Sequence, residues 1–94
     1  MGLFVVRYDY REGSDAVRDE HRPAHRAYLG QQAGLRLSGP TSDRGGVLIF
    51  DAATAAEVEA LLNEDPFWTL DTIQSRTISG WTPVSGSWLE PLGL

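Results

Sequence analysis

Apolar and polar positions alternate along the chain in segments that are typical of strands and helices. Residues 3–10 are rich in β-branched and aromatic side chains and begin apolar before they alternate, which predicts a first strand. Ser14 can cap a helical segment over 15–21, which Pro23 interrupts because proline lacks the amide donor. We therefore expect a short helix or turn, then a main helix that begins near Pro23 and ends before Gly34. The main helix carries a modest apolar stripe, formed by Ala24, Ala27, Tyr28 and Ala33.

The next segment predicts an antiparallel hairpin. Residues 35–38 form a second strand that runs into Gly39 and Pro40, and residues 43–46 are a turn signal. The continuous apolar run 47–50 predicts the paired strand. Because this run lacks polar alternation, it indicates a strand that is buried on both faces.

The second helix has the clearest local signal in the chain. Thr54 and Glu57 form a capping box, in which the threonine hydroxyl accepts from a free amide and the glutamate reaches back. The apolar face of this helix is formed by Val58, Leu61 and Leu62. Asp65 followed by Pro66 ends the helix, because the residue before a proline avoids helical conformation. Residues 71–81 alternate as a last strand.

The resulting element order is β-α-β-β-α-β, the split βαβ arrangement of ferredoxin-like α+β folds. This order places two helices on one face of a four-stranded antiparallel sheet. Nothing in the chain covers the other face, so we expect a homodimer that packs sheet on sheet. We divide the chain into a domain over 1–82 and a C-terminal tail over 83–94. The tail retains apolar residues, and it could cover the partner subunit, fill a pocket or project freely.

Composition and charge limit the classes of function. The chain has 94 residues, 41% hydrophobic and 22% charged, which is enough for one compact domain. No apolar run reaches the length of a membrane span, and Arg7 brings charge too early for a signal peptide, so we expect a soluble cytoplasmic protein without a membrane partner. The net charge is −5 and the arginines are spread along the sequence, which disfavours nucleic-acid binding. The absence of cysteine excludes disulfides, thiolate metal sites and a cysteine nucleophile.

The two histidines, His21 and His25, are spaced four residues apart, as in zinc-binding helices. Pro23 stands between them, and no third ligand has motif spacing, whereas zinc needs three or four converging ligands. We therefore predict no metal site and no cofactor.

His25 and Asp65 are the candidate chemical pair. Imidazole is the side chain best suited to proton transfer near neutral pH. In a split βαβ fold the two helices lie antiparallel on the same sheet face, so the two residues can approach each other. Phe67, Trp68 and Trp81 lie close to that point in the sequence and could wall an apolar pocket. The alternatives stay open: a surface or core histidine, a plain helix stop, and aromatic residues of an ordinary core.

Several motifs together resemble the YciI-like (YCII-related) family over roughly residues 3–82. The motifs are Arg22-Pro23-Ala24-His25, Tyr28-Leu29, the segment Gly-Leu-Arg-Leu-Ser-Gly-Pro at 34–40, Gly46, the helix over 55–62, Asp65-Pro66-Phe67 and Trp81. The Arg-x-x-His and Asp-Pro-Phe motifs are fairly specific as a pair, whereas either alone is a weak signal.

The resemblance implies a dimeric α+β barrel of ferredoxin-like subunits, whose proposed active site maps onto His25 and Asp65. One branch of that family removes chloride from a chlorinated hydroxyquinol, and most members have no assigned reaction. The predicted substrate-binding residues are Arg22, Tyr28, Gly39, Phe67 and Trp68. Arg22 is the candidate for holding a substrate anion, with a surface salt bridge as its alternative role.

We therefore expect a cofactor-independent lyase or isomerase that acts on a small cyclic or aromatic substrate, with His25 as general base and Asp65 orienting it. The alternative is a dimeric domain that binds a small molecule without catalysis. A cofactor-free monooxygenase on the same barrel is a third possibility, and it rests on fold analogy alone.

Overall fold

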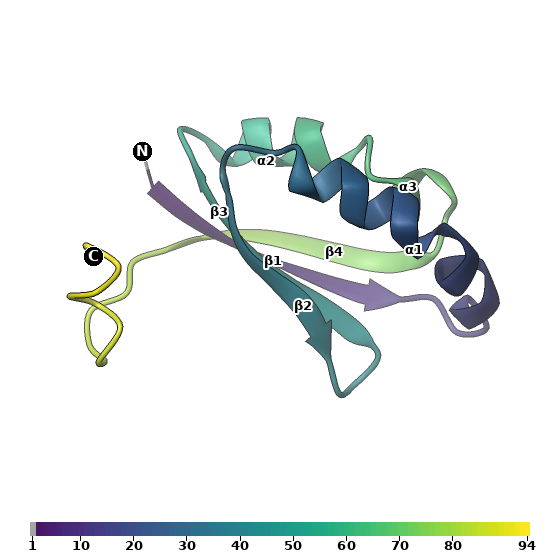
Figure 1. Cartoon of the computed structure of the whole chain (residues 1–94), viewed down its shortest axis with the longest axis horizontal. Helices are drawn as coiled ribbons and strands as arrows, with labels where there is room; N and C mark the ends of the chain where they lie inside the picture. Colours follow the sequence, from purple (N-terminus) through teal and green to yellow (C-terminus); the bar gives the residue numbers. More distant parts are fainter. Residues whose placement is uncertain (1) are drawn as a thin grey trace.

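Helices cover one face of a single antiparallel sheet (Figure 1). The computed structural model describes residues 2–94, and Met1, with which the predicted domain 1–82 begins, lies outside the described residues. The elements are β1 (Gly2–Tyr10), α1 (Asp15–Gly30), β2 (Leu35–Thr41), β3 (Gly45–Ala52), α2 (Ala55–Leu62), α3 (Pro66–Thr69) and β4 (Ile73–Trp81). The strand order is β2-β3-β1-β4, so the predicted ferredoxin-like α+β class is confirmed.

The core lies between the helices and the sheet. Alternation along β1 directs Val6 and Tyr8 toward the helices, where both are fully buried. The register pairs Val6 with Leu48 of β3, so apolar side chains of neighbouring strands lie side by side on this face. The helical segments contribute Leu29, Val58, Leu62 and Phe67 to the same core. This packing holds α1 and α3 in contact above the sheet.

One continuous helix replaces the predicted break at Pro23. α1 runs from Asp15 to Gly30 with the proline inside it. Pro23 is exposed, so its ring faces solvent, and its missing amide removes a single helical hydrogen bond. Ser14 occupies the N-cap position without a capping bond, since its hydroxyl instead accepts from Arg18 Nε at 3.0 Å.

The covered face of α1 is polar, and the predicted alanine stripe is wrong. Ala24, Ala27 and Ala33 are all exposed, while the one buried residue of α1 is Leu29. Half-buried positions on the covered face include Arg18, Arg22, His25 and Tyr28. Helix faces that lie on a sheet are normally apolar, so basic side chains here indicate a role other than packing.

The hairpin of β2 and β3 is confirmed, and both strands are longer than predicted. β2 lies at the sheet edge, which allows Pro40 within it, because an edge strand has one side free of ladder bonds. In β3, Leu48 and Phe50 are buried, whereas Val47 and Ile49 on the other face are half-buried. In a single chain, β3 is therefore buried on the face that carries Leu48 and Phe50 and only half-buried on the other face, whereas the sequence predicts burial on both.

The capping box at the start of α2 is confirmed. The Thr54 hydroxyl accepts from the Glu57 amide at 3.2 Å, and the Glu57 carboxylate accepts from the Ala53 amide at 3.3 Å. The short helix α3 is not predicted by the sequence pattern. Asp65 both follows α2 and caps α3, with Pro66 at the first helical turn.

The sheet face opposite the helices is open in this chain. Leu37 and Trp81 are 56% and 47% exposed there. The tail 83–94, yellow in Figure 1, lies beyond the sheet, away from the helices, and its described residues form turns rather than helix or strand. Tail and sheet together line a cavity of about 850 Å³. Within residues 2–94, no helix has the length and apolar character needed to cross a membrane.

Candidate active site

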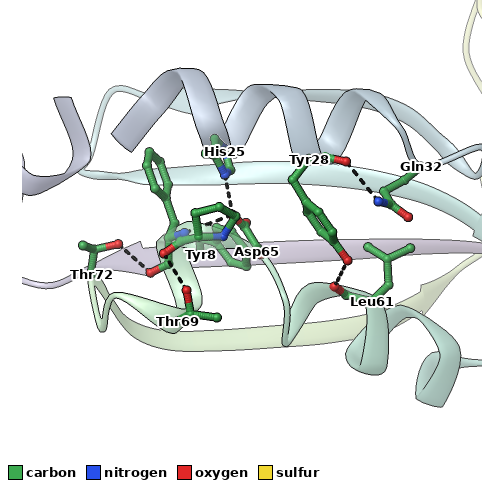
Figure 2. Close-up of polar contacts among 10 residues, drawn as sticks. Tyr8, His25, Tyr28, Gln32, Leu61, Asp65, Thr69 and Thr72 are labelled. Atoms are coloured by element: carbon green, nitrogen blue, oxygen red, sulfur yellow. Dashed lines mark hydrogen bonds and ion pairs between the residues drawn. The ribbon is translucent and has the colours of Figure 1, made fainter. Parts of the chain in front are cut away.

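His25 and Asp65 meet between α1 and α3. Figure 2 shows His25 directed from α1 toward Asp65, whose Oδ1 lies 2.7 Å from His25 Nδ1. The side chain of His25 is 13% exposed and that of Asp65 is 0% exposed. The contact that the topology predicts is therefore present, and the catalytic role of the two residues stays a prediction.

Three donors hold the Asp65 carboxylate. Besides His25 at Oδ1, the Phe67 amide donates to the same oxygen at 3.0 Å. The Tyr8 hydroxyl donates to Oδ2, also at 3.0 Å. A buried carboxylate needs such donors to offset its lost hydration, and together they fix its orientation. The Asp-Pro-Phe motif supplies one of them, because aspartate at a helix N-cap accepts from the amide two residues later.

Tyr8 is a member of this site that the sequence analysis does not identify. It is fully buried at the centre of β1. Burial raises the pKa of the Tyr8 hydroxyl, and the negative charge of Asp65 raises it further, so the group keeps its proton and donates. The sequence contains one signal for this position: the alternation along β1 directs its even-numbered residues, Tyr8 among them, toward the helices.

The imidazole of His25 is fixed on two sides. Its Nδ1 bonds to Asp65, and its ring stacks on Phe67 with centroids 3.8 Å apart and planes at 2°. A carboxylate only accepts, so Nδ1 carries a hydrogen, and in the neutral imidazole it is Nε2 that has the lone pair. Nε2 has no hydrogen-bond partner within residues 2–94. This tautomer presents a proton acceptor on the side away from Asp65.

A cavity of about 330 Å³ lies beside His25, between α1 and the β2–β3 side of the sheet. Its lining comprises Tyr8, Tyr10, Arg18, Arg22, His25, Arg26, Leu29, Gly30, Leu35, Ser38, Gly39, Pro40, Gly46, Val47, Leu48 and Phe67. A Cβ at Gly46 would lie 2.9 Å from the Tyr10 hydroxyl oxygen, so a larger residue at this position would require the Tyr10 side chain to shift. The volume is at the small end of the range for ligand pockets.

The structure brings Arg22, Gly39 and Phe67 of the predicted substrate-binding set together in this lining. The other two residues of that set, Tyr28 and Trp68, lie outside the lining. The Tyr28 hydroxyl donates to the Leu61 carbonyl of α2 at 2.6 Å (Figure 2), and the Trp68 ring lies 3.7 Å from the Arg76 guanidinium carbon.

Two further candidates from the sequence, Trp81 and His21, also lie outside the cavity beside His25. Trp81 is on the open sheet face, where it lines the cavity beside the tail. His21 is 3.8 Å from Glu20, and no cluster of three metal-binding side chains exists in the described part of the chain.

A family model described as the YCII-related domain matches residues 2–82. The comparison with curated proteins gives no match. A solved structure of 5-chloro-2-hydroxyhydroquinone dehydrochlorinase (TftG) from Burkholderia phenoliruptrix, in complex with 2,5-dihydroxybenzoquinone, has TM-score 0.79 and 28% identity over 87% of this chain and 95% of that chain.

Two more distant structures share the fold alone. An uncharacterised NIPSNAP domain protein from Burkholderia xenovorans has TM-score 0.55 and 14% identity over 90% of this chain and 96% of its own. An antibiotic biosynthesis monooxygenase has TM-score 0.58 and 10% identity over 90% of this chain and 100% of its own. These likenesses carry no information about the reaction.

Proposed function

This chain belongs to the YCII-related domain family, and on that premise we propose that it is a cofactor-independent enzyme of lyase or isomerase type. The observation that carries the proposal is the 2.7 Å contact of His25 with a fully buried Asp65. That contact leaves Nε2 without a partner in the described chain, beside the cavity. Such a tautomer is the form of histidine that acts as a general base.

In the proposed step, His25 Nε2 takes a proton from an activated C–H or O–H of the substrate. The electron pair of the broken bond moves into the substrate ring, where it forms a conjugated enolate or expels a leaving group. The imidazolium then returns the proton to another ring atom or to the departing group. Asp65 stabilises the imidazolium, and Tyr8 acts as a positioning residue through Asp65. General acid–base catalysis contributes about 10²–10⁴-fold, so the substrate must already be activated.

The substrate is proposed to be one small ring. The cavity of about 330 Å³ suits a single-ring compound, and Phe67, Tyr10 and Leu29 contribute apolar surface to its lining. The dehydrochlorinase with TM-score 0.79 is named for a chlorinated hydroxyhydroquinone and binds a dihydroxybenzoquinone, which supports cyclic diols and quinones as the first compounds to test. The proposal does not include chloride as the leaving group, because no lining residue distinguishes chlorine.

We further propose that a second copy of the chain covers the open sheet face and that the tail 83–94 packs on this partner. Leu37, Trp81 and Trp88 are 56%, 47% and 67% exposed in the single chain. An apolar surface of this kind on a small domain favours self-association. Cytoplasmic location stays a prediction.

The experiment is a turnover screen with two histidine variants. Wild type, His25→Gln and His21→Gln are incubated with chlorinated hydroxyhydroquinones, dihydroxybenzoquinones and unsaturated lactones, and products are followed by proton NMR. We expect turnover by wild type and His21→Gln, with a loss of about 10²–10⁴-fold in His25→Gln. Equal turnover by both variants would contradict the proposal. Tight binding without turnover of any compound would favour the non-catalytic binding domain instead.

A further inference from the structure

The charge of the cavity differs from that of the whole chain. The protein has 13 acidic and 8 basic residues, for a net charge of −5. The cavity lining nevertheless contains Arg18, Arg22 and Arg26 and has no aspartate or glutamate among its described residues. Asp65 lies behind His25 and is fully buried. The cavity lining is therefore basic, although the protein as a whole is acidic and two of these arginines, Arg18 and Arg22, each pair with an aspartate of α1.

Arg18 is held in place by residues at the start of α1 and by Tyr10 of β1. Arg18 donates from Nε to the Ser14 hydroxyl at 3.0 Å and from Nη2 to Asp15 at 2.7 Å. Its guanidinium carbon lies 4.1 Å from the centre of the Tyr10 ring, and its side chain is 11% exposed. Burying a guanidinium to this extent has a desolvation cost, which Ser14, Asp15 and the Tyr10 ring offset while they hold its charge beside the cavity.

Arg22 and Arg26 keep most of their donors free. Arg22 donates from Nη1 to Asp19 at 2.7 Å, which leaves four of its five N–H donors. Arg26 is exposed, and its side chain forms no hydrogen bond or ion pair with another residue of 2–94. The two arginines flank His25 in the sequence, one turn before it and directly after it. Free guanidinium donors suit bidentate contacts with a carboxylate or another oxyanion.

We infer that the cavity takes its ligand as an anion, a single ring that bears a carboxylate or an ionised enol or phenol, with Arg22 and Arg26 pairing with the oxyanion. This inference rests on the proposed function and names its substrate class. The same cations stabilise negative charge that develops on the ring when His25 removes a proton. Arg18 adds a fixed positive charge on the Tyr10 side of the cavity.

Two matched pairs of ring compounds test the charge requirement by calorimetry and by shifts of the His25 ring signals in NMR. Benzoate and benzamide have nearly the same shape and differ in charge, as do 4-nitrophenolate and 4-nitroaniline. The first pair tests carboxylates, and the second tests phenolates. We expect at least one anion to bind about tenfold or more tightly than its neutral partner, since a contact with a charged group is worth a factor of this order.

Arginine variants then locate the contact. The double variant Arg22→Gln/Arg26→Gln should lose the preference for the anion. Arg36→Gln removes the same charge outside this cavity, where Arg36 pairs with Asp51 at 3.3 Å, and should keep the preference. Equal binding of anion and neutral partner in both pairs, or no binding of any of the four compounds, would overturn the inference. An equal loss in Arg36→Gln would do the same.

The histidine variant separates this inference from the proposed function. His25→Gln should lose turnover and still prefer the anion, because the arginines remain. If only neutral rings were turned over, the result would support His25 as the base and reject the anion site. Anion binding without turnover of any compound would support the anion site and reject the base.

Discussion

The Tyr8–Asp65 hydrogen bond allows a prediction in which two substitutions depend on each other. Asp65 Oδ1 faces two donors, His25 Nδ1 and the Phe67 amide, while Oδ2 faces the Tyr8 hydroxyl. In Asp65→Asn, the amide oxygen must take the Oδ1 position, because an NH₂ group there would face the Phe67 N–H. The NH₂ group then faces Tyr8 and donates to its hydroxyl oxygen, so a bond to a charged acceptor becomes a bond between two neutral groups.

This geometry sets the cost of Tyr8→Phe in each background. In the wild type, the substitution removes a 3.0 Å bond to a charged, fully buried acceptor and leaves Oδ2 unpaired. A hydrogen bond to a charged group contributes about 1.5–3 kcal/mol to stability. In Asp65→Asn, the bond joins two neutral groups, so Tyr8→Phe should cost only about 0.5–1.5 kcal/mol. The expected coupling energy is therefore about 1 kcal/mol.

Urea unfolding at pH 7, followed by tryptophan fluorescence, gives the four free energies of unfolding. Tyr28→Phe is the matched control, because the Tyr28 hydroxyl donates to the Leu61 carbonyl and not to Asp65. Its cost should be the same in both backgrounds. A Tyr8→Phe cost that is equal in the two backgrounds within about 0.5 kcal/mol would refute the assigned hydrogen bonds.

Three further predictions concern pH, assembly and backbone packing. Burial raises the pKa of Tyr8 above its ordinary value of 10.0, so only the unfolded chain loses this proton just above pH 10, and the stabilisation present below pH 10 declines as pH rises. For one proton, the free energy of unfolding falls by about 1.4 kcal/mol per pH unit. Tyr8→Phe should remove this contribution from the slope of unfolding free energy against pH above pH 10. An unchanged slope in Tyr8→Phe would contradict the prediction. Leu37→Glu places a charge on the open sheet face and should shift sedimentation toward a single chain of 10.3 kDa. The control Leu70→Glu, at a residue that is 40% exposed outside that face, should cause no shift. A native protein that is already monomeric would reject the proposed dimer. Gly34→Ala places a Cβ 2.5 Å from the Asp51 carbonyl oxygen and should cost about 1–3 kcal/mol of stability. Gly30→Ala, whose Cβ has no neighbour within 4 Å, should cost none. Equal thermal unfolding of the two variants would contradict this prediction.

The element order follows from local signals in the sequence. The capping box at Thr54 and the turn before β3 are formed by residues close in the chain, so both are visible without the structure. The approach of His25 to Asp65 follows from topology alone, because both helices must lie on the same sheet face. A pattern can therefore predict a contact across 40 residues when the fold constrains it.

The remaining features depend on surroundings that the sequence pattern does not contain. Pro23 stays inside α1 because that position faces solvent, and solvent exposure becomes known only when the helix is placed. Tyr8 has the same alternation as its apolar neighbours, and only the position of Asp65 distinguishes it as a donor. Trp68 and Phe67 are adjacent in the sequence, yet the turn of α3 sends Phe67 toward His25 and Trp68 toward Arg76.

Deuterium wash-in from D₂O shows whether His25 acts as a base, because it detects proton removal even when no product forms. Each ring compound that binds is incubated with wild type, His25→Gln or His21→Gln, and loss of its activated C–H signal is followed by proton NMR. We expect exchange by wild type and His21→Gln, and a rate about 10²–10⁴-fold lower in His25→Gln. Exchange that is as fast in His25→Gln as in the wild type would contradict the assignment of His25 as the base.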